Sequence, residues 1–277
     1  MTVRRWRRGA VAVLAVLCVL GPARPSEVRV ASDLGRLPAD RYEFTSRDFE
    51  RLQRASALLV RQCMARRGHR DFPLDPRYPS DPIATSVVST DYGVLDFEEA
   101  RRWGYGWDPS EPLSAPPAGR RMTDAEFADF PACGTSADRR LLRGVEREGD
   151  WLFASSRAIE TDRAVLRDPH LRTALEEWSR CMVDHGFPHY PDPVAAYSSD
   201  AWHRGGDGNT RHTRRERATA VADIRCKRHH RTAQALHTAR ARHQTADIAR
   251  HRDGYADGLR ALEAYRDNIA EVLRKEG

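Results

Sequence analysis

The sequence contains no stretch in which apolar and polar residues alternate over several positions, the pattern typical of a half-buried strand. Apolar residues recur instead at helical spacing, as in the stripe between residues 49 and 63. Aromatic residues make up only 8% of the chain, but leucine, valine, isoleucine and alanine are frequent enough to form a core, which favours a globular protein over a disordered one. We therefore expect an all-α protein with almost no sheet.

No apolar run is long enough to cross a bilayer comfortably. Residues 10–20 form a run of about eleven, whereas a spanning helix needs about 20 residues. Four arginines precede this run and Gly21, Pro22 and Ala23 follow it. A basic segment, a short apolar run and small residues predict a secretory signal peptide over residues 1–23. A retained membrane anchor and lipidation at Cys18 are the alternatives.

Cysteine is scarce, and no two cysteines form a Cys-x2-Cys pair. Four cysteines remain once the predicted signal peptide is removed: Cys63, Cys133, Cys181 and Cys226. An even number in an exported chain predicts disulfides. The rival interpretation is a zinc site that includes His185 and the neighbouring His229 and His230. Because an oxidising compartment disfavours free thiolates, we expect two disulfides, no metal and no cofactor.

A short motif occurs twice. Cysteine, methionine, glycine, an aromatic residue and proline recur at offsets of 0, 1, 5, 9 and 10. The copies are Cys63, Met64, Gly68, Phe72 and Pro73, and Cys181, Met182, Gly186, Tyr190 and Pro191. This repetition predicts a duplicated module, in which a helix ends at glycine and the chain leaves through a proline-rich strap. We assign the modules to residues 45–149 and 150–277, the second with a long C-terminal helix.

The duplication narrows the three disulfide pairings that four cysteines allow. If each module is self-contained, Cys63 pairs with Cys133 and Cys181 pairs with Cys226. Pairing like with like, Cys63 with Cys181 and Cys133 with Cys226, also respects the duplication. We favour the sequential pattern, because contacts within a unit require less of the chain to be in place first.

Capping residues and glycines place the helices. We expect them over residues 45–68, from 96, from 123, from 136, over 150–166, over 168–186, and from 213 almost to the end of the chain. Four prolines between residues 73 and 82 exclude a long helix there. In the last segment Gly254 and Gly258 allow a kink or a helical hairpin. The aromatic and glycine cluster at residues 103–107 either fills a gap between helices or offers rings on which a sugar could stack.

Positive charge is concentrated in one segment. Residues 204–252 hold 13 arginines and lysines against 4 acidic residues, together with six of the eleven histidines. Such a tract could bind an envelope polyanion, anionic lipid or nucleic acid, although the predicted export disfavours nucleic acid. The alternative is a solvated helix face. The candidate polyanion-binding residues are Arg214, Arg215, Arg225 and Arg228.

Catalytic signatures are missing. The sequence has neither the Gly-x-Ser-x-Gly motif of serine hydrolases nor the His-Glu-x2-His motif of metalloproteases. The glycine-rich loop at residues 205–208 lacks the Lys-Ser/Thr of a phosphate-binding loop. We therefore expect a binding or accessory protein of the cell envelope, secreted or extracytoplasmic, with association to a membrane or to an envelope protein complex left open. An envelope hydrolase whose site is assembled from scattered residues is the alternative.

Several motifs carry a resemblance. They are Trp178-Ser179-Arg180-Cys181-Met182 with Gly186, Ala222-Asp223-Ile224-Arg225-Cys226-Lys227, Trp103-Gly104-Tyr105-Gly106, and Cys133-Gly134. Together they resemble motifs of uncharacterised exported proteins of actinomycetes, many of which look like lipoproteins. The resemblance implies an exported helical protein and no known activity. The chain departs from the lipoprotein pattern because Leu17, rather than a small residue, precedes Cys18.

Overall fold

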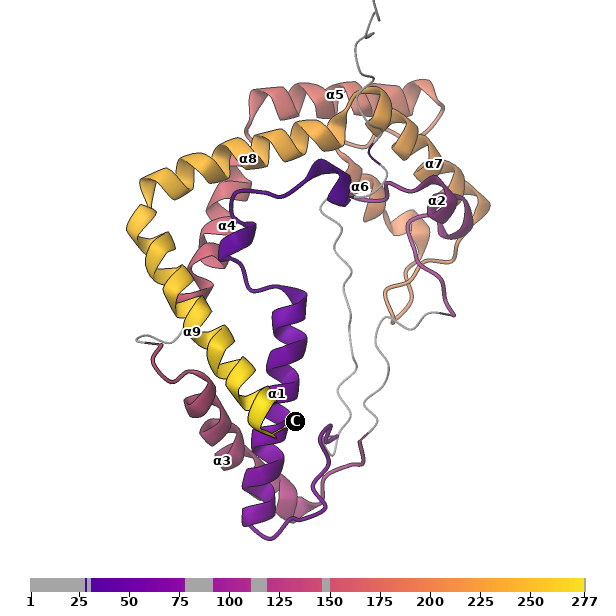
Figure 1. The fold of residues 1–277 in the computed structure, drawn as a ribbon. Helices are drawn as coiled ribbons and strands as arrows, with labels where there is room; N and C mark the ends of the chain where they lie inside the picture. The colour runs from indigo at the N-terminus through magenta and orange to yellow at the C-terminus, as the bar shows by residue number, and fades with distance from the viewer. Residues whose placement is uncertain (1–27, 29–30, 78–91, 111–118, 146–149, 277) are drawn as a thin grey trace, which may run out of the picture.

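The computed structural model describes residues 28, 31–77, 92–110, 119–145 and 150–276. These residues contain nine α-helices and no strand, and 69% of them are helical, which confirms the all-α prediction. The helices are α1 (Ser46–Arg66), α2 (Phe97–Trp103), α3 (Asp124–Leu141), α4 (Phe153–Val165), α5 (Pro169–Asp184), α6 (Pro193–Tyr197), α7 (Arg214–His229), α8 (Thr232–Arg250) and α9 (Arg252–Glu276). Figure 1 shows their arrangement.

The predicted signal peptide, residues 1–23, lies outside the described residues, as does most of the first proline-rich strap. Within the part of the chain that the structure describes, no helix combines the length and the apolar character that a bilayer crossing requires.

Both disulfides follow the sequential pairing. Cys63 on α1 is bonded to Cys133 on α3, with the Cα atoms 5.5 Å apart. Cys181 on α5 is bonded to Cys226 on α7, with the Cα atoms 5.8 Å apart. The predicted connectivity is therefore confirmed, and the like-with-like pairing is excluded.

The two copies of the duplicated motif end their helices in the same way. Gly68 and Gly186 have φ angles of 100° and 80°, in the left-handed region that glycine adopts without a steric penalty. In each copy the amide after the glycine donates to the carbonyl of the motif's methionine, at 3.0 and 3.1 Å. Met64 and Met182 are fully buried. The sequence repeat is thus a structural repeat of a capped helix end.

Each disulfide lies in a separate hydrophobic core. The core around the first disulfide includes a helix of the second predicted module, and the core around the second disulfide includes a helix of the first. The first core contains Leu59 and Met64 of α1, Cys133 and Leu141 of α3, and Ile269 and Val272 of α9. The second contains Ala100 of α2, Trp178 and Met182 of α5, Ala196 of α6, and Ile224 and Cys226 of α7. Figure 1 shows α9 beside α1 and α3, and α2 beside α7. The helix α8 links the two groups and packs against α4 and α5.

Two expectations about helix boundaries are wrong. The segments expected to start separately at residues 123 and 136 form one helix, α3, which continues through Pro131. The C-terminal segment is divided at residues 230–231 and at His251, not at its glycines. Its first break includes Arg231, whose φ of 51° is left-handed, a conformation that an α-helix cannot contain.

Gly254 and Gly258 serve close packing instead of a bend. They lie inside α9, where the side chain of Phe153 packs against the helix. A Cβ atom on Gly254 would clash with the ring of Phe153, and one on Gly258 would lie 2.9 Å from the Cβ of Phe153. The absence of side chains therefore lets the start of α4 approach α9.

Candidate functional site

The N-terminus of α7 is fixed by a buried carboxylate. Thr213 and Glu216 form a capping box, and Glu216 has no exposed surface. Its carboxylate also accepts hydrogen bonds from the backbone amide of Tyr105, at 2.9 Å, and from the hydroxyl of Thr210, at 2.6 Å. The segment that follows α2 is thereby attached to the start of α7. Because Tyr105 is only 1% exposed, its ring fills space between helices and offers no face on which a sugar could stack.

The helices α5 and α7 are joined by a hydrogen bond from Trp178 of α5 to a buried ion pair within α7. Lys227 donates to Asp223 at 2.9 Å, and both side chains are at most 2% exposed. The indole Nε1 of Trp178 on α5 donates to the other oxygen of Asp223 at 3.0 Å. Burial raises the pKa of Asp223, and the Lys227 ammonium and the Trp178 indole oppose that rise. One turn further along each helix lie Cys181 and Cys226, so the Trp178–Asp223 hydrogen bond and the disulfide connect the same two helices.

A pocket of about 630 Å³ lies at the C-terminal ends of these two helices. Its lining side chains are Glu177, Arg180, Cys181, Asp184 and His185 of α5, with Arg225, His229 and His230 at the end of α7. The volume falls within the range of small-molecule sites, roughly 300–1,000 Å³. The sequence predicted Arg225 as a polyanion-binding residue. The three histidines entered only the zinc interpretation, which was not favoured. The sequence did not predict Arg180, Glu177 or Asp184 as site residues.

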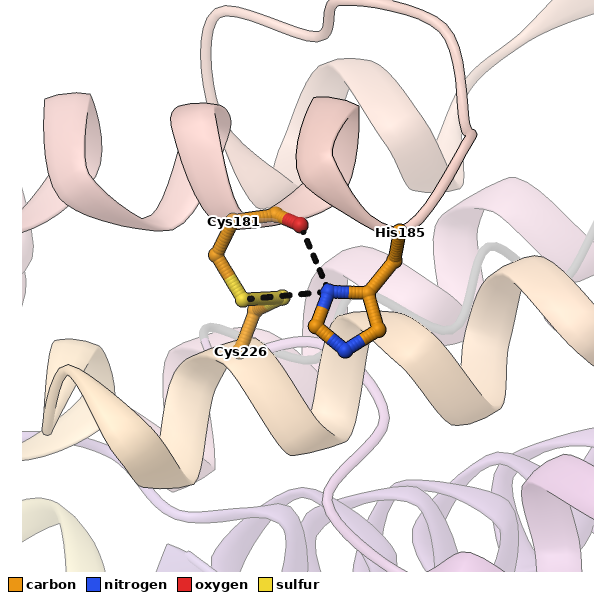
Figure 2. A group of neighbouring side chains, drawn as sticks. All are labelled: Cys181, His185 and Cys226. Carbon is orange, nitrogen blue, oxygen red and sulfur yellow. Dashed lines mark hydrogen bonds between the residues drawn. A yellow bond between two sulfur atoms is a disulfide. The ribbon is translucent and has the colours of Figure 1, made fainter.

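His185 lies directly against the disulfide. Figure 2 shows its ring turned towards Cys181, one turn earlier on α5, with Cys226 on the facing helix α7. The Nδ1 atom is 2.8 Å from the carbonyl oxygen of Cys181 and 3.8 Å from the Sγ atom of Cys181. His185 is exposed and Cys181 is half-buried, whereas Cys226 is fully buried. One edge of the disulfide is therefore reached from the pocket.

Two arginines and two acidic residues, Glu177 and Asp184, bring opposite charges into the pocket. Arg180 and Arg225 are exposed and immediately precede Cys181 and Cys226. Neither forms an ion pair with a carboxylate in the described residues, so both guanidinium groups are available to a ligand. Of the two acidic residues in the lining, Glu177 is engaged with His230 at 3.4 Å. The disulfide fixes the backbone positions from which the two arginine side chains extend.

The α7–α8 junction adds backbone strain at the edge of the pocket. Arg231 precedes α8 in a left-handed conformation that non-glycine residues adopt at a cost. The rings of His229 and His230 meet edge to face, with centroids 4.6 Å apart. His230 also lines a second pocket of about 470 Å³ between α5 and α8. The strained turn thus directs two histidines towards adjoining pockets.

The four arginines predicted to bind a polyanion lie in different surroundings. Arg214 and Arg215 are exposed in the first turn of α7. They precede Arg225 by at least ten positions, which is roughly 15 Å along a helix. Arg228 is half-buried: its guanidinium lies 4.3 Å from the ring centroid of Phe97 and donates to the carbonyl of Leu95. Only Arg225 lies in the pocket.

Several other cations of the basic tract are paired with groups of the protein itself. Arg204 donates to backbone carbonyls of Tyr197 and Gly208. Further cations pair with acidic residues: Lys227 with Asp223, Arg240 with Asp162, Arg242 with Asp168, and Arg250 with Asp247. The high local charge therefore overstates the positive surface that a ligand could reach.

The sequence did contain a signal for the pocket. An arginine precedes each cysteine of the second disulfide, whereas Gln62 and Ala132 precede the cysteines of the first. His185 occupies the position that Arg67 holds in the first copy of the motif, four residues after its cysteine. Arg67 instead pairs with Asp129 at 2.8 Å. The second module therefore differs from the first in the arginines and the histidine beside its disulfide.

Residues with metal-binding side chains gather at one place in the described part of the chain. The side-chain ligand atoms of Cys181, His185 and Cys226 all lie within 4.8 Å of one another. The two sulfurs are engaged in the disulfide. No serine lines either pocket, so neither offers a serine–histidine pair for hydrolysis.

Comparison of the chain with protein-family models, with curated proteins and with solved structures finds no match.

Proposed function

We propose that the protein is an exported, non-enzymatic component of an actinomycete cell envelope that binds phosphate groups of an envelope polyanion or anionic lipid. The observation that carries this proposal is the pair formed by Arg180 and Arg225. The two guanidinium groups line one pocket from two helices, and both lack an acidic partner in the described residues. Guanidinium groups bind phosphate oxygens through charge-assisted hydrogen bonds.

The rigidity of the site supports binding at this place. The disulfide joins the residues that follow the two arginines, and the hydrogen bond from Trp178 to Asp223 connects the same helices one turn earlier. Because these helix ends are fixed, binding an anion does not require ordering of the backbone that carries the two arginines.

The disulfides also bear on the compartment. Two disulfides in one chain suggest an oxidising, extracytoplasmic setting. The predicted signal peptide at residues 1–23 and the resemblance to exported actinomycete proteins support export. Phosphate is the anionic group shared by phosphate-rich wall polymers and anionic lipid headgroups.

We expect the full mature chain to bind a glycerol-phosphate polymer at low ionic strength, and to bind it more weakly as salt screens the charges. The double variant Arg180→Gln/Arg225→Gln should weaken binding about tenfold, since exposed ion pairs contribute up to about 1 kcal/mol each. Calorimetric titration measures this loss. Parallel titrations with inorganic phosphate and with vesicles containing anionic lipid separate polymer, free ion and membrane as sources of the phosphate.

The matched control is Arg214→Gln/Arg215→Gln, which removes two exposed arginines from the same helix outside the pocket. At an ionic strength of about 0.15 M it should leave the affinity within about twofold of that of the unmodified protein, because these residues lie roughly 15 Å from Arg225 and the Debye length there is about 8 Å. Equal losses in the two double variants would show that net charge, and not the pocket, governs binding. Failure to bind any of the three probes at low salt would refute the proposal.

A further inference from the structure

We propose that reduction of the Cys181–Cys226 disulfide converts it into a zinc-binding site, in which Cys181, Cys226 and His185 are the three protein ligands. This inference concerns a state of the protein different from that of the proposed anion pocket and does not depend on it. It rests on the placement of two sulfurs and one imidazole at the ends of α5 and α7, where all three ligand atoms lie within 4.8 Å of one another.

The geometry suits tetrahedral zinc. With Zn–S bonds of about 2.3 Å and Zn–N bonds of about 2.05 Å, a tetrahedral angle places the sulfur and nitrogen ligands about 3.6 Å apart. The Nδ1 atom of His185 is 3.8 Å from the Sγ atom of Cys181. Two sulfur ligands of one zinc lie about 3.8 Å apart. The reduced sulfurs can reach this separation by rotation about their Cα–Cβ bonds, with the Cα atoms remaining near 5.8 Å.

The histidine can change partners without leaving a buried group unsatisfied. In the disulfide state Nδ1 lies 2.8 Å from the carbonyl oxygen of Cys181. That carbonyl also accepts the helical hydrogen bond from the backbone amide of His185, at 3.1 Å. When Nδ1 binds zinc, the carbonyl therefore keeps one donor. Because His185 is exposed, the ring can move by the small amount that coordination requires.

The reaction balances with a dithiol as reductant. A dithiol gives two electrons and two protons to the Cys181–Cys226 bond, which becomes two thiols while the reductant becomes a disulfide. Zinc then displaces the two thiol protons, and each sulfur binds it as a thiolate. Arg180 and Arg225, which flank the cysteines, favour the thiolate form electrostatically. With three protein ligands, the fourth coordination position is left for water or an anionic ligand.

The first disulfide serves as an internal control. It joins the equivalent helix end to α3, but Arg67 stands where the second copy has His185. Arg67 is paired with Asp129, and a guanidinium cannot bind a metal cation. Reduced Cys63 and Cys133 therefore provide two thiols without an imidazole. The inference predicts zinc binding at one of the two disulfides only.

The test uses the full mature chain, reduced with a phosphine under inert gas and titrated with Co²⁺ as a spectroscopic probe and with Zn²⁺ in competition. We expect one equivalent of Co²⁺ to give a thiolate-to-cobalt charge-transfer band and the visible bands of tetrahedral cobalt. Cys181→Ser/Cys226→Ser should lose these bands, although Cys63 and Cys133 remain. His185→Gln is a substitution at an exposed position and should retain the helical circular dichroism. It should weaken zinc binding about 10- to 100-fold.

Three results would overturn the inference: no tetrahedral cobalt spectrum in the reduced protein, the same spectrum in Cys181→Ser/Cys226→Ser, or unchanged zinc affinity in His185→Gln. If reduction alone lowers the helical dichroism, zinc is expected to restore it, because metal binding and folding are coupled at such sites. Loss of helix that zinc does not restore would also count against the site.

Discussion

Replacing Lys227 with methionine is expected to lower the free energy of unfolding by about 3–5 kcal/mol at neutral pH. The substitution leaves the Asp223 carboxylate at the centre of the second core without its cation, and an uncompensated buried charge costs about this much. The indole of Trp178 remains as a donor to Asp223 but carries no charge. Urea unfolding, followed by circular dichroism, measures the loss.

The same variant should acquire a characteristic pH dependence. Burial already raises the pKa of Asp223, and removal of Lys227 takes away the largest opposing effect. A carboxyl group with a raised pKa in the folded state binds a proton more readily there than in the unfolded chain. Stability of Lys227→Met should therefore increase as the pH falls and decrease as the pH rises through the folded-state pKa of Asp223.

The control is Asp223→Asn/Lys227→Met, which removes both charges and keeps an oxygen acceptor for the Trp178 indole. We expect this double variant to recover most of the lost stability and to lose the added pH dependence, since neutral replacement of a buried ion pair is often tolerated. If Lys227→Met alone is as stable as the unmodified protein, Lys227 does not compensate a buried negative charge on Asp223 as described.

Removal of either disulfide is expected to cost about 4 kcal/mol of unfolding free energy. The chain-entropy model depends only logarithmically on loop length, so the separations of 70 and 45 residues give similar values. Unfolding of Cys63→Ala/Cys133→Ala and of Cys181→Ala/Cys226→Ala in denaturant measures the two losses. Since many domains are stable by only about 5–15 kcal/mol, each loss is a large fraction of the total.

The two disulfide variants should differ in binding although they resemble each other in stability. Cys181→Ala/Cys226→Ala frees the helix ends that carry Arg180 and Arg225, so it should weaken binding of the glycerol-phosphate polymer under conditions where the protein remains folded. Cys63→Ala/Cys133→Ala alters a different core and should retain the affinity. If both variants weaken binding equally, the Cys181–Cys226 disulfide has no special role in positioning the pocket.

Local signals in the sequence predicted the helix ends and the disulfides. Gly68 and Gly186 stop their helices because a left-handed residue ends the helical hydrogen-bond pattern, and only nearby residues decide this. Asp168 before Pro169 marks the start of α5 for the same local reason. The disulfide pairing followed from duplication, which relates distant segments without any knowledge of their packing.

Long-range packing explains what the sequence did not reveal. Pro131 alone argues for a helix break, but α3 continues through it because α3 packs along α1 and is tied to it by Cys133. Asp223 and Lys227 have the spacing of an exposed helical ion pair, and only the contact with Trp178 shows that the pair is buried. The pocket likewise combines helix ends separated by more than 40 residues, so no local window contains it.

The most direct test of the account is a map of backbone amide chemical shifts in the full mature chain during titration with glycerol phosphate at low salt. We expect saturable changes concentrated at residues 177–185 of α5 and 225–230 at the end of α7, around Arg180 and Arg225. These changes should disappear in Arg180→Gln/Arg225→Gln. Changes centred on the first turn of α7, at Arg214 and Arg215, or spread evenly over the basic tract would contradict the assignment of the pocket as the phosphate-binding site.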